Sequence, residues 1–597
     1  MRIKRITAAA CAAAMLFTGA AGGCGKKEKK KSVSVSGIET NDKGTVDKEL
    51  TSLELQRLMG NGINLGNTME AYGHGALSPD SEPSAFETRW GQPVTTQEMI
   101  DGMKDAGFDS LRIPVAWTNA MDFESGDYTI DPQYLDRVEE IVNYALNDDM
   151  YVIINDHWDG SWWGMFGSHT QETRDQAMEL YKSMWTQISE RFKNYSDHLI
   201  FEGANEELGD RLNDKDIAKD SGALTKPERY EMTNLINQTF VDTVRATGGN
   251  NADRFLLIPG YNTDITNTCD DRFVMPNDTA KDKLLISVHY YTPWDYCGTQ
   301  SVDHWGSVLN YEEQNRLFEM MTKFTEQGYG VIIGEFAVAL NSDGSVKSDT
   351  DKFIKNVYAN CDLYGYCPML WDCSSLYKRT QCEIPDQTMA QVFLEARYEN
   401  EKDMTDEELQ ADARARLDEY YAEAQANAED IGAIPSSEDT AVAWIMYQSS
   451  DYSVSYCVGD TYDPTSYSNG VKAENVLIEG EGTYTVSLDL SQAGGGNGFA
   501  FSALGIYNGE KFYPGYIIDI TDIKINGESV EQSTPEYTNS DDGNCTRVNI
   551  YNGWVSDLPD DARTADGSLE GCSPIILDTG ALPRISRIDI TFDYIAP

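Results

Sequence analysis

The order of apolar and polar residues between positions 55 and 395 is the feature that most constrains the fold. Short runs of β-branched and apolar residues alternate there with longer amphipathic stretches, which is the pattern of parallel strands joined by crossover helices. Strands are expected at residues 61–67, 109–117, 151–158, 198–206, 254–260, 284–291, 330–336 and 368–373. Eight such alternations predict an α/β fold, a (β/α)8 TIM barrel over residues 51–400.

The regions on either side of this barrel differ from it in composition. Residues 25–50 are rich in Lys and then in Ser, Thr and Asp, so we expect a flexible tether. Residues 401–440 are dense in helix formers and charge, with Thr405 and Glu408 at capping-box spacing, and predict a helical connector. Residues 441–597 alternate apolar and polar positions between Gly, Asp and Asn turns, which predicts a β-sandwich.

The first 24 residues predict export. They consist of the basic segment MRIKR, an apolar run over residues 6–21, and small residues before Cys24. The ending Gly22-Gly23-Cys24 resembles a bacterial lipobox, which implies lipidation of Cys24 and a cell-surface lipoprotein on the outer face of a membrane. A simple secretory signal cleaved nearby is the alternative.

Charge and cysteine spacing exclude several classes of partner. The formal net charge is −51 at pH 7, which would repel nucleic acid and suits a neutral substrate. Nine of the eleven Cys follow Cys24, without a CxxC pair or a His at metal-ligand spacing, so no zinc site is expected. We expect a monomer with no metal and no organic cofactor. A structural calcium ion and the pairing of the thiols stay open.

The expected strands end in polar or aromatic residues. In a TIM barrel, functional sites lie at the carboxyl ends of the strands. Any one of these residues could be a loop anchor, but together they predict a single site at one barrel mouth. The strand-end residues are Asn67, Arg112, His157, Glu206, His289, Glu335 and Trp371.

Two glutamates stand out among these strand ends. In LIFEGANEELGD, strand alternation would put Glu202 and Glu206 on one face and Asn205 and Glu207 on the other. Glu202 would lie about 13 Å below Glu206, at roughly 3.3 Å per residue, and is expected to be buried and paired. In GVIIGEF, Glu335 follows a buried run. Two carboxylates facing each other across a barrel mouth are what glycoside cleavage requires.

An ordered set of motifs resembles glycoside hydrolase family 5. The motifs are GINLGNT, ETRWGQPVTT, GFDSLRIPVAW, NDHW, FEGANEE, SVHYY, VIIGEF and LWD, over about residues 55 to 395. GNT with WGQPVTT is similar to subfamily 4, a group of endo-β-1,4-glucanases and xyloglucanases. The resemblance implies that Glu206 is the general acid/base and Glu335 the nucleophile.

The resemblance also implies roles for residues around this pair. Asn205 would hydrogen-bond the sugar 2-hydroxyl, and Arg112 would keep the nucleophile ionised. His157 and His289 would orient the pair. Tyr291 would reach the nucleophile, and Trp371 would form the floor of the reacting subsite.

Two departures from the family pattern concern the walls of the cleft. Trp158 follows His157 where many members carry a second His, and the segment LWDC has Leu370 and Cys373 in place of the first Trp and the Asn of WWDN. Both changes affect substrate preference more than reaction type.

Loop aromatics predict an extended groove. Aromatic rings bury the apolar faces of sugars, so a row of them would bind a polysaccharide and favour internal cleavage. The candidates, with Trp158 as the one assigned to substrate binding, are Tyr72, Trp117, Trp158, Trp162, Trp163, Trp294 and Trp305. In the C-terminal module, Trp444 and Trp554 predict either a carbohydrate-binding surface or the core of a spacer.

These observations favour a retaining endo-β-1,4-glucanase that acts on cellulose-like β-glucan, mixed-linkage glucan or xyloglucan. One alternative is a β-mannanase with the same mechanism. The other is a non-catalytic surface lipoprotein that captures glycans.

Overall fold

The structure is a computed structural model. It describes residues 33–597, apart from residues 73–75, 160–161, 216–219, 301, 303, 431–432, 459–461, 465, 469, 542–543, 556, 579 and 581. The predicted signal peptide, Cys24 and the first part of the expected tether lie outside the described residues. Within the described part, no helix combines the length and apolar character needed to span a membrane.

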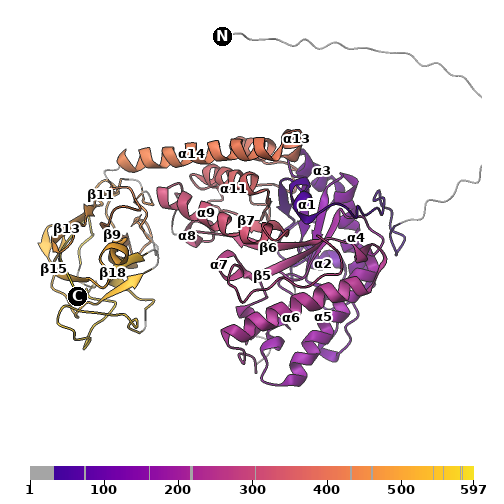
Figure 1. Ribbon diagram of the computed structural model, residues 1–597, viewed down its shortest axis with the longest axis horizontal. Coiled ribbons are helices and arrows are strands. Elements are labelled where there is room, and N and C mark those ends of the chain that lie inside the picture. Colours follow the sequence, from indigo (N-terminus) through magenta and orange to yellow (C-terminus); the bar gives the residue numbers. More distant parts are fainter. Residues whose placement is uncertain are drawn as a thin grey trace, which may run out of the picture.

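Eight parallel strands form a closed barrel, which confirms the predicted fold class (Figure 1). Each strand pairs with the next, and β8 pairs with β1 through Gly62 opposite Met369. The strands are β1 (Gly62–Asn64), β2 (Ser110–Ile113), β3 (Tyr151–Ile154), β4 (Leu199–Glu202), β5 (Leu256–Asp264), β6 (Leu284–Tyr290), β7 (Gly330–Phe336) and β8 (Cys367–Leu370). Several strands end earlier than expected from the sequence, because the chain turns into the mouth loops where the apolar run gives way to polar residues.

Helices cover the outside of the barrel and bury their apolar faces against the strands. Their starts follow local capping rules: Thr51 and Glu54 form a capping box at α1, and Asp131 caps α4 ahead of Pro132. The helices are α1 (Ser52–Leu58), α2 (Pro83–Glu87), α3 (Gln97–Asp105), α4 (Pro132–Asn147), α5 (Gln171–Phe192), α6 (Lys226–Ala246), α7 (Ile265–Thr268), α8 (Trp294–Cys297), α9 (Val308–Met320), α10 (Thr322–Thr325), α11 (Thr350–Tyr364), α12 (Gln387–Glu395) and α13 (Tyr398–Glu401).

The expectation of a free tether is wrong for residues 33–50, which are bound to the barrel. Ser36 donates a hydrogen bond to Glu139 of α4 over 2.8 Å. The main-chain N–H of Asp47 donates to Asp197, just before β4, also over 2.8 Å. The small polar residues that suggested a solvated segment instead find partners at the end of the barrel opposite the mouth.

The predicted connector is the long helix α14 (Asp406–Asp430). Thr405 and Glu408 form the expected capping box, because each side chain bonds to the other residue's main-chain N–H. One face of α14 packs on α11 through a small apolar cluster, and Arg416 pairs with Asp362 over 2.6 Å. The helix runs along one edge of the molecule from the barrel toward the C-terminal module (Figure 1).

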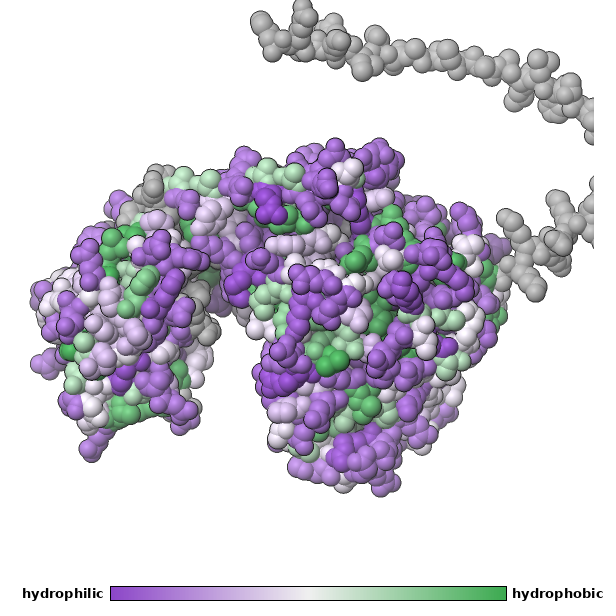
Figure 2. Space-filling view, in the orientation of Figure 1, coloured by the Kyte–Doolittle hydropathy of each residue, from purple (hydrophilic) through white to green (hydrophobic). Residues whose placement is uncertain are grey.

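The C-terminal module is a sandwich of two antiparallel sheets, as predicted. β19 shows the reason, because RIDITFDYI alternates strictly between half-exposed residues and buried residues that enter the core. Figure 2 shows the barrel and the sandwich as two lobes with a notch between them below α14. The elements of the sandwich are β9 (Val442–Gln448), β10 (Ser455–Tyr456), β11 (Lys472–Glu474), β12 (Val476–Leu477), β13 (Gly482–Asp489), β14 (Phe501–Tyr507), α15 (Gly509–Phe512), β15 (Ile517–Ile525), β16 (Glu528–Ser529), β17 (Thr538–Asp541), β18 (Cys545–Asn552) and β19 (Arg587–Ile595).

All nine cysteines in the described part of the chain are free thiols. Five of them are buried, so they act as small apolar side chains in the two cores.

Candidate active site

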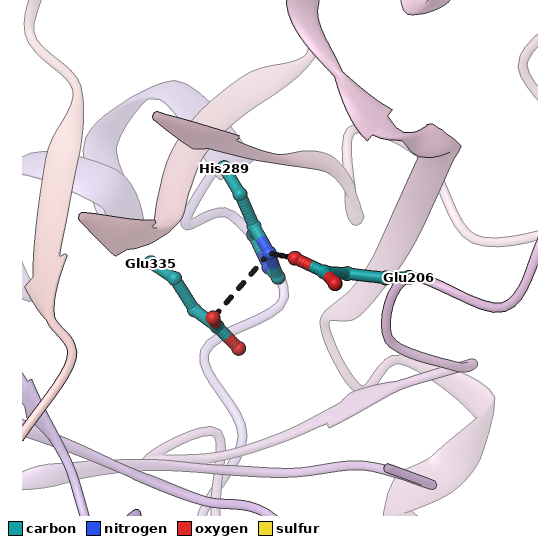
Figure 3. A group of neighbouring side chains, drawn as sticks. All are labelled: Glu206, His289 and Glu335. Carbon is teal, nitrogen blue, oxygen red and sulfur yellow. Dashed lines mark hydrogen bonds and ion pairs between the residues drawn. The ribbon is translucent and has the colours of Figure 1, made fainter. Parts of the chain in front are cut away.

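The segment after β4 does not continue the strand, so the expected alternation of side chains fails there. β4 ends at Glu202, and the chain then turns, with the Glu207 carboxylate accepting the main-chain N–H of Asn205 over 2.8 Å. This local bond turns Asn205 toward the barrel axis. Its Oδ1 accepts a hydrogen bond from Arg112 over 2.8 Å, and Glu206 points toward His289 and Glu335 (Figure 3).

Glu335 reaches the same place from β7, where it pairs in register with His289 of β6. Gly334 makes this approach possible. A Cβ atom at Gly334 would lie 2.7 Å from Ser287 Oγ and 3.2 Å from the His289 ring. The GEF motif therefore combines a carboxylate with the one residue type that lets the imidazole lie beside it.

Glu206, His289 and Glu335 form one compact group (Figure 3). His289 Nδ1 lies 2.8 Å from Glu206 Oε1 and 3.6 Å from Glu335 Oε2. The three ligand-type atoms lie within 4.8 Å of one another. A carboxylate pair this close matches double displacement, whereas inverting enzymes need a gap of about 6.5–9.5 Å for a water molecule.

The same group is the only set of His, Cys, Asp and Glu side chains in the described part of the chain that is close enough to hold a metal ion. The direct hydrogen bond between His289 and Glu206 uses two of the atoms that such an ion would need. This contact favours acid and base chemistry at the site.

Arg112 lies buried beneath the two carboxylates and bonds to several side chains around them. Its guanidinium bonds to Glu202 over 2.7 Å and to Glu335 over 2.9 Å, and it also donates to Asn64 and Asn205. Arg112 and Glu202 are both fully buried, which confirms that Glu202 is a paired structural carboxylate. Arg112 donates to Oε1 of Glu335, and the Tyr291 hydroxyl donates to Oε2 over 2.9 Å.

The environments of the two candidate carboxylates differ. Burial raises the pKa of Glu335, although the charges of His289 and Arg112 and the hydrogen bond from Tyr291 favour its ionised form. Burial alone would lower the pKa of His289, but Glu335 and Glu206 raise it overall. Burial alone would raise the pKa of Glu206, but the hydrogen bond with His289 and the charges of His289 and Arg112 lower it overall.

His157 and Trp371 line the same mouth. Their rings stack with centroids 5.5 Å apart and planes at 12°. Burial, followed by the charge of Arg112, lowers the pKa of His157 well below its usual value, so the ring is neutral. Asn67 lies in the loop after β1, next to Gly66, where a Cβ would meet the Trp371 ring at 2.9 Å. The prediction that Asn67, as one of the strand-end residues, binds substrate is untested.

Several aromatics expected in the groove are in the core, which corrects that part of the prediction. The buried ones are Trp117, Trp162, Trp163 and Trp305. Trp162 and Trp163 stack on each other at 4.3 Å inside the loop after β3. Sequence alone does not tell which face of a mouth loop a ring occupies, and these rings fill the space between the loops and the helices.

Two of the expected aromatics remain accessible, Trp158 with 39% and Trp294 with 61% of its surface exposed. Tyr72 packs edge-on against Trp90, which is 38% exposed. Sequence reasoning missed Trp90, although it stands inside the quoted motif ETRWGQPVTT. Glu207 and Arg211, which contact Trp158, were also missed as site residues.

Comparisons with known proteins agree with this geometry. A family model described as cellulase (glycosyl hydrolase family 5) matches residues 70–375. Endoglucanase B of Ruminococcus albus is 38% identical over 353 residues, covering 58% of this chain and 78% of that protein. A xyloglucan-specific endo-beta-1,4-glucanase of Bacteroides ovatus is 33% identical over 356 residues, covering 56% and 68%. A solved structure, a GH5-4 broad specificity endoglucanase from Ruminococcus champanellensis with bound cellotriose, gives a TM-score of 0.51 at 31% identity, covering 58% and 99%.

The matched residues contain both candidate carboxylates. The chain is therefore a glycoside hydrolase and belongs to the cellulase family, glycosyl hydrolase family 5.

Proposed function

We propose that the protein is a retaining endo-β-1,4-glucanase that cleaves internal linkages of cellulose-like β-glucan, mixed-linkage glucan or xyloglucan. The observation that carries this proposal is the approach of Glu206 and Glu335 to within 4.8 Å, with His289 between them. That spacing suits a covalent glycosyl-enzyme intermediate.

In the first step, a Glu335 oxygen attacks the anomeric carbon while Glu206 gives its proton to the departing glycosidic oxygen. The bond between carbon and that oxygen breaks, and a glycosyl ester of Glu335 forms. In the second step, Glu206 takes a proton from water, whose oxygen attacks the same carbon and releases Glu335 as a carboxylate. Two inversions leave the configuration of the sugar unchanged.

The neighbouring contacts support this division of roles. Glu335 is bonded to Arg112 and Tyr291, which hold an anion in a fixed orientation for attack. Glu206 is more exposed than Glu335 and bonds to His289, a partner that can give or accept a proton. Asn205, fixed by Arg112, is proposed to bond the sugar 2-hydroxyl, and the His157–Trp371 stack to form the floor of the reacting subsite.

The choice of β-glucan is supported by the relatives described above, which carry the names endoglucanase and xyloglucan-specific endoglucanase. A β-mannanase remains the alternative, because the reaction is the same and only the orientation of one hydroxyl near Asn205 differs. The assignment to glycoside hydrolases replaces the non-catalytic alternative.

The proposal is tested with purified cellulose, mixed-linkage glucan, xyloglucan and mannan. We expect reducing ends to be released from at least one β-glucan together with a rapid loss of viscosity, and the first-formed products to have the β-configuration by NMR. Faster hydrolysis of mannan than of every β-glucan would select the alternative. An α-configured first product would exclude double displacement.

We also propose that the sandwich binds glycan through Trp554. The indole is 68% exposed and packs on Phe501, whose ring lies beneath the guanidinium of Arg547 at 5.1 Å. Trp444, the other candidate, is fully buried beneath Tyr462 and belongs to the core. A rigid exposed ring beside polar groups is the usual surface for a sugar face.

Replacing Trp554 with Ala is expected to weaken binding to insoluble β-glucan by about two- to tenfold, the loss of one aromatic contact. Hydrolysis of short soluble oligosaccharides should not change, because Trp554 belongs to the other domain. Pull-down with insoluble β-glucan measures the effect, with Tyr452→Ala as the control, since Tyr452 is another exposed sandwich aromatic at 54%. If both variants bound insoluble β-glucan equally well, Trp554 would have no role in glycan binding.

We further propose that the protein is exported and held by a lipid on Cys24 at the outer face of the membrane, where it acts as a monomer. The support is the sequence pattern before Cys24. Replacing Cys24 with Ala in the expressing bacterium should move the enzyme from the membrane fraction to a soluble fraction. An unchanged membrane fraction would favour another mode of attachment.

A further inference from the structure

Trp158 has an unusual backbone conformation for an aromatic residue. Its φ is +49°, in the left-handed region that side chains of this size rarely occupy. Such a conformation costs on the order of 1–3 kcal/mol and persists only where the surroundings hold it. The residue follows His157 directly, at the point where many family members carry a second His. The conformation sets the direction in which the indole of Trp158 leaves the main chain.

Glu207 supplies the contact that holds this conformation. One carboxylate oxygen accepts the main-chain N–H of Trp158 over 2.8 Å, and the other accepts that of Asn205 over 2.8 Å. The side chain is 1% exposed, and burial raises its pKa to about 7, although Arg211 and the two N–H donors favour the carboxylate. A single buried group thus ties the loop after β3 to the loop that carries Asn205 and Glu206.

Arg211 supports the indole from one side. It lies in the short 3-10 helix η4 (Asp210–Asn213), and its guanidinium lies over the Trp158 ring at 3.8 Å from the centroid. A cation above one face of an indole is attracted to the ring and keeps it from rotating. Since 39% of Trp158 remains exposed with Arg211 in place, the ring still offers surface to a ligand.

We propose that Trp158, backed by Arg211 and aimed by Glu207, is the platform for the glucosyl ring on the leaving-group side of the scissile bond. This inference rests on the proposed function. The acid protonates the departing oxygen, so the sugar that carries this oxygen must lie on the Glu206 side of the anomeric carbon. Glu207 bonds the main chain of Trp158 to the loop that carries Glu206, which supports a place for the indole on that side. Glu207 is a positioning residue that sets the distance between platform and acid.

Two substrates with the same sugar on the glycone side separate this role from others. An aryl β-cellotrioside has a leaving group without a sugar, whereas a cello-oligosaccharide cleaved after its third residue has a glucosyl leaving group. In Trp158→Ala, kcat/KM for the oligosaccharide is expected to fall about tenfold more than kcat/KM for the aryl glycoside. An equal fall on both substrates, or no fall on either, would overturn the proposal.

Glu207 variants test the positioning role. Glu207→Ala removes both acceptors. It should reduce the ratio of kcat/KM for the oligosaccharide to kcat/KM for the aryl glycoside about as much as Trp158→Ala does. Glu207→Gln keeps one acceptor oxygen and should lie between Glu207→Ala and the wild type. Combining Glu207→Ala with Trp158→Ala should reduce the ratio no further, because Glu207 acts through Trp158. An additive reduction in the double variant would overturn the positioning role.

Measuring hydrolysis of both substrates also distinguishes failure of this inference from failure of the proposed function. A wild-type enzyme that hydrolyses neither substrate overturns the proposed function, and the platform with it. An active enzyme whose substrate ratio is unaffected by Trp158→Ala overturns only the platform. Thermal unfolding of each variant shows whether the fold is retained, and the ratio is insensitive to the fraction of folded enzyme because both substrates report on the same sample.

Discussion

Glu335→Gln is expected to lower kcat on β-glucan by a factor on the order of 10⁴ or more while the protein stays folded. The amide keeps the size of the side chain and its contacts with Tyr291 and Arg112, but it cannot form the glycosyl ester. Arg112 still pairs with Glu202 over 2.7 Å, so its buried positive charge keeps one carboxylate partner. Release of reducing ends measures the loss, and circular dichroism with thermal unfolding confirms the fold.

Glu206→Ala is the matched variant for the other half of the pair. Loss of the general acid/base should cost about 10²–10⁴-fold on β-glucan, and less on an aryl cellobioside whose leaving group needs little protonation. Azide should then restore turnover of the aryl substrate and give a β-glycosyl azide, because it replaces water in the second step. The same β-azide from Glu335→Ala, and not from Glu206→Ala, would exchange the two roles.

The barrel was predictable because each strand core is a short apolar run set off by amphipathic stretches. The ends of the strands were less predictable. Residues 203–206 continue the pattern of β4 in the sequence, but a bond from Asn205 to Glu207 turns the chain out of the sheet. Likewise, the polar residues 33–50 suggested a tether, because their partners on α4 and before β4 are more than a hundred residues away in the chain.

The proximity of the candidate carboxylates was predictable for a related reason. A carboxylate at the end of a buried strand has few structural explanations, so Glu206 and Glu335 were recognisable, and so was the cation Arg112 at an equivalent strand end. The side chains that form the wall of the mouth were not predictable. Whether Trp162 lines a groove or fills the core depends on packing between loops, and the link from Glu207 to Trp158 joins two loops whose proximity the sequence does not encode in any local pattern.

Arg112→Met is expected to lower the free energy of unfolding by about 3–5 kcal/mol at pH 7 and to abolish activity. The side chain is fully buried, and its removal leaves Glu202 and Glu335 as buried carboxylates without their cation. Chemical denaturation measures the first effect and release of reducing ends the second.

The pH dependence of the Arg112→Met effect has a definite sign. Without the cation, burial raises the folded-state pKa of Glu335 further above its unfolded value, so the loss of stability is largest at pH values above that raised pKa. The loss of stability shrinks as the pH falls and Glu335 takes up a proton. Denaturation curves of wild type and variant at pH 7 and pH 5 should therefore converge toward the lower pH. A gap of the same size at both pH values would show that Arg112 stabilises the fold by packing alone.

The double variant Arg112→Met with Glu202→Gln separates the structural role of Arg112 from its role at the nucleophile. Glu202 bonds to Arg112 and lies below the candidate carboxylate pair, so replacing it with Gln removes one of the two buried charges that have lost their cation. Most of the lost stability should return. Activity should not, because Glu335 still lacks the donor that fixes its Oε1. If the double variant recovered activity along with stability, Arg112 would act on catalysis only through the fold, and Tyr291 alone would suffice to orient the nucleophile.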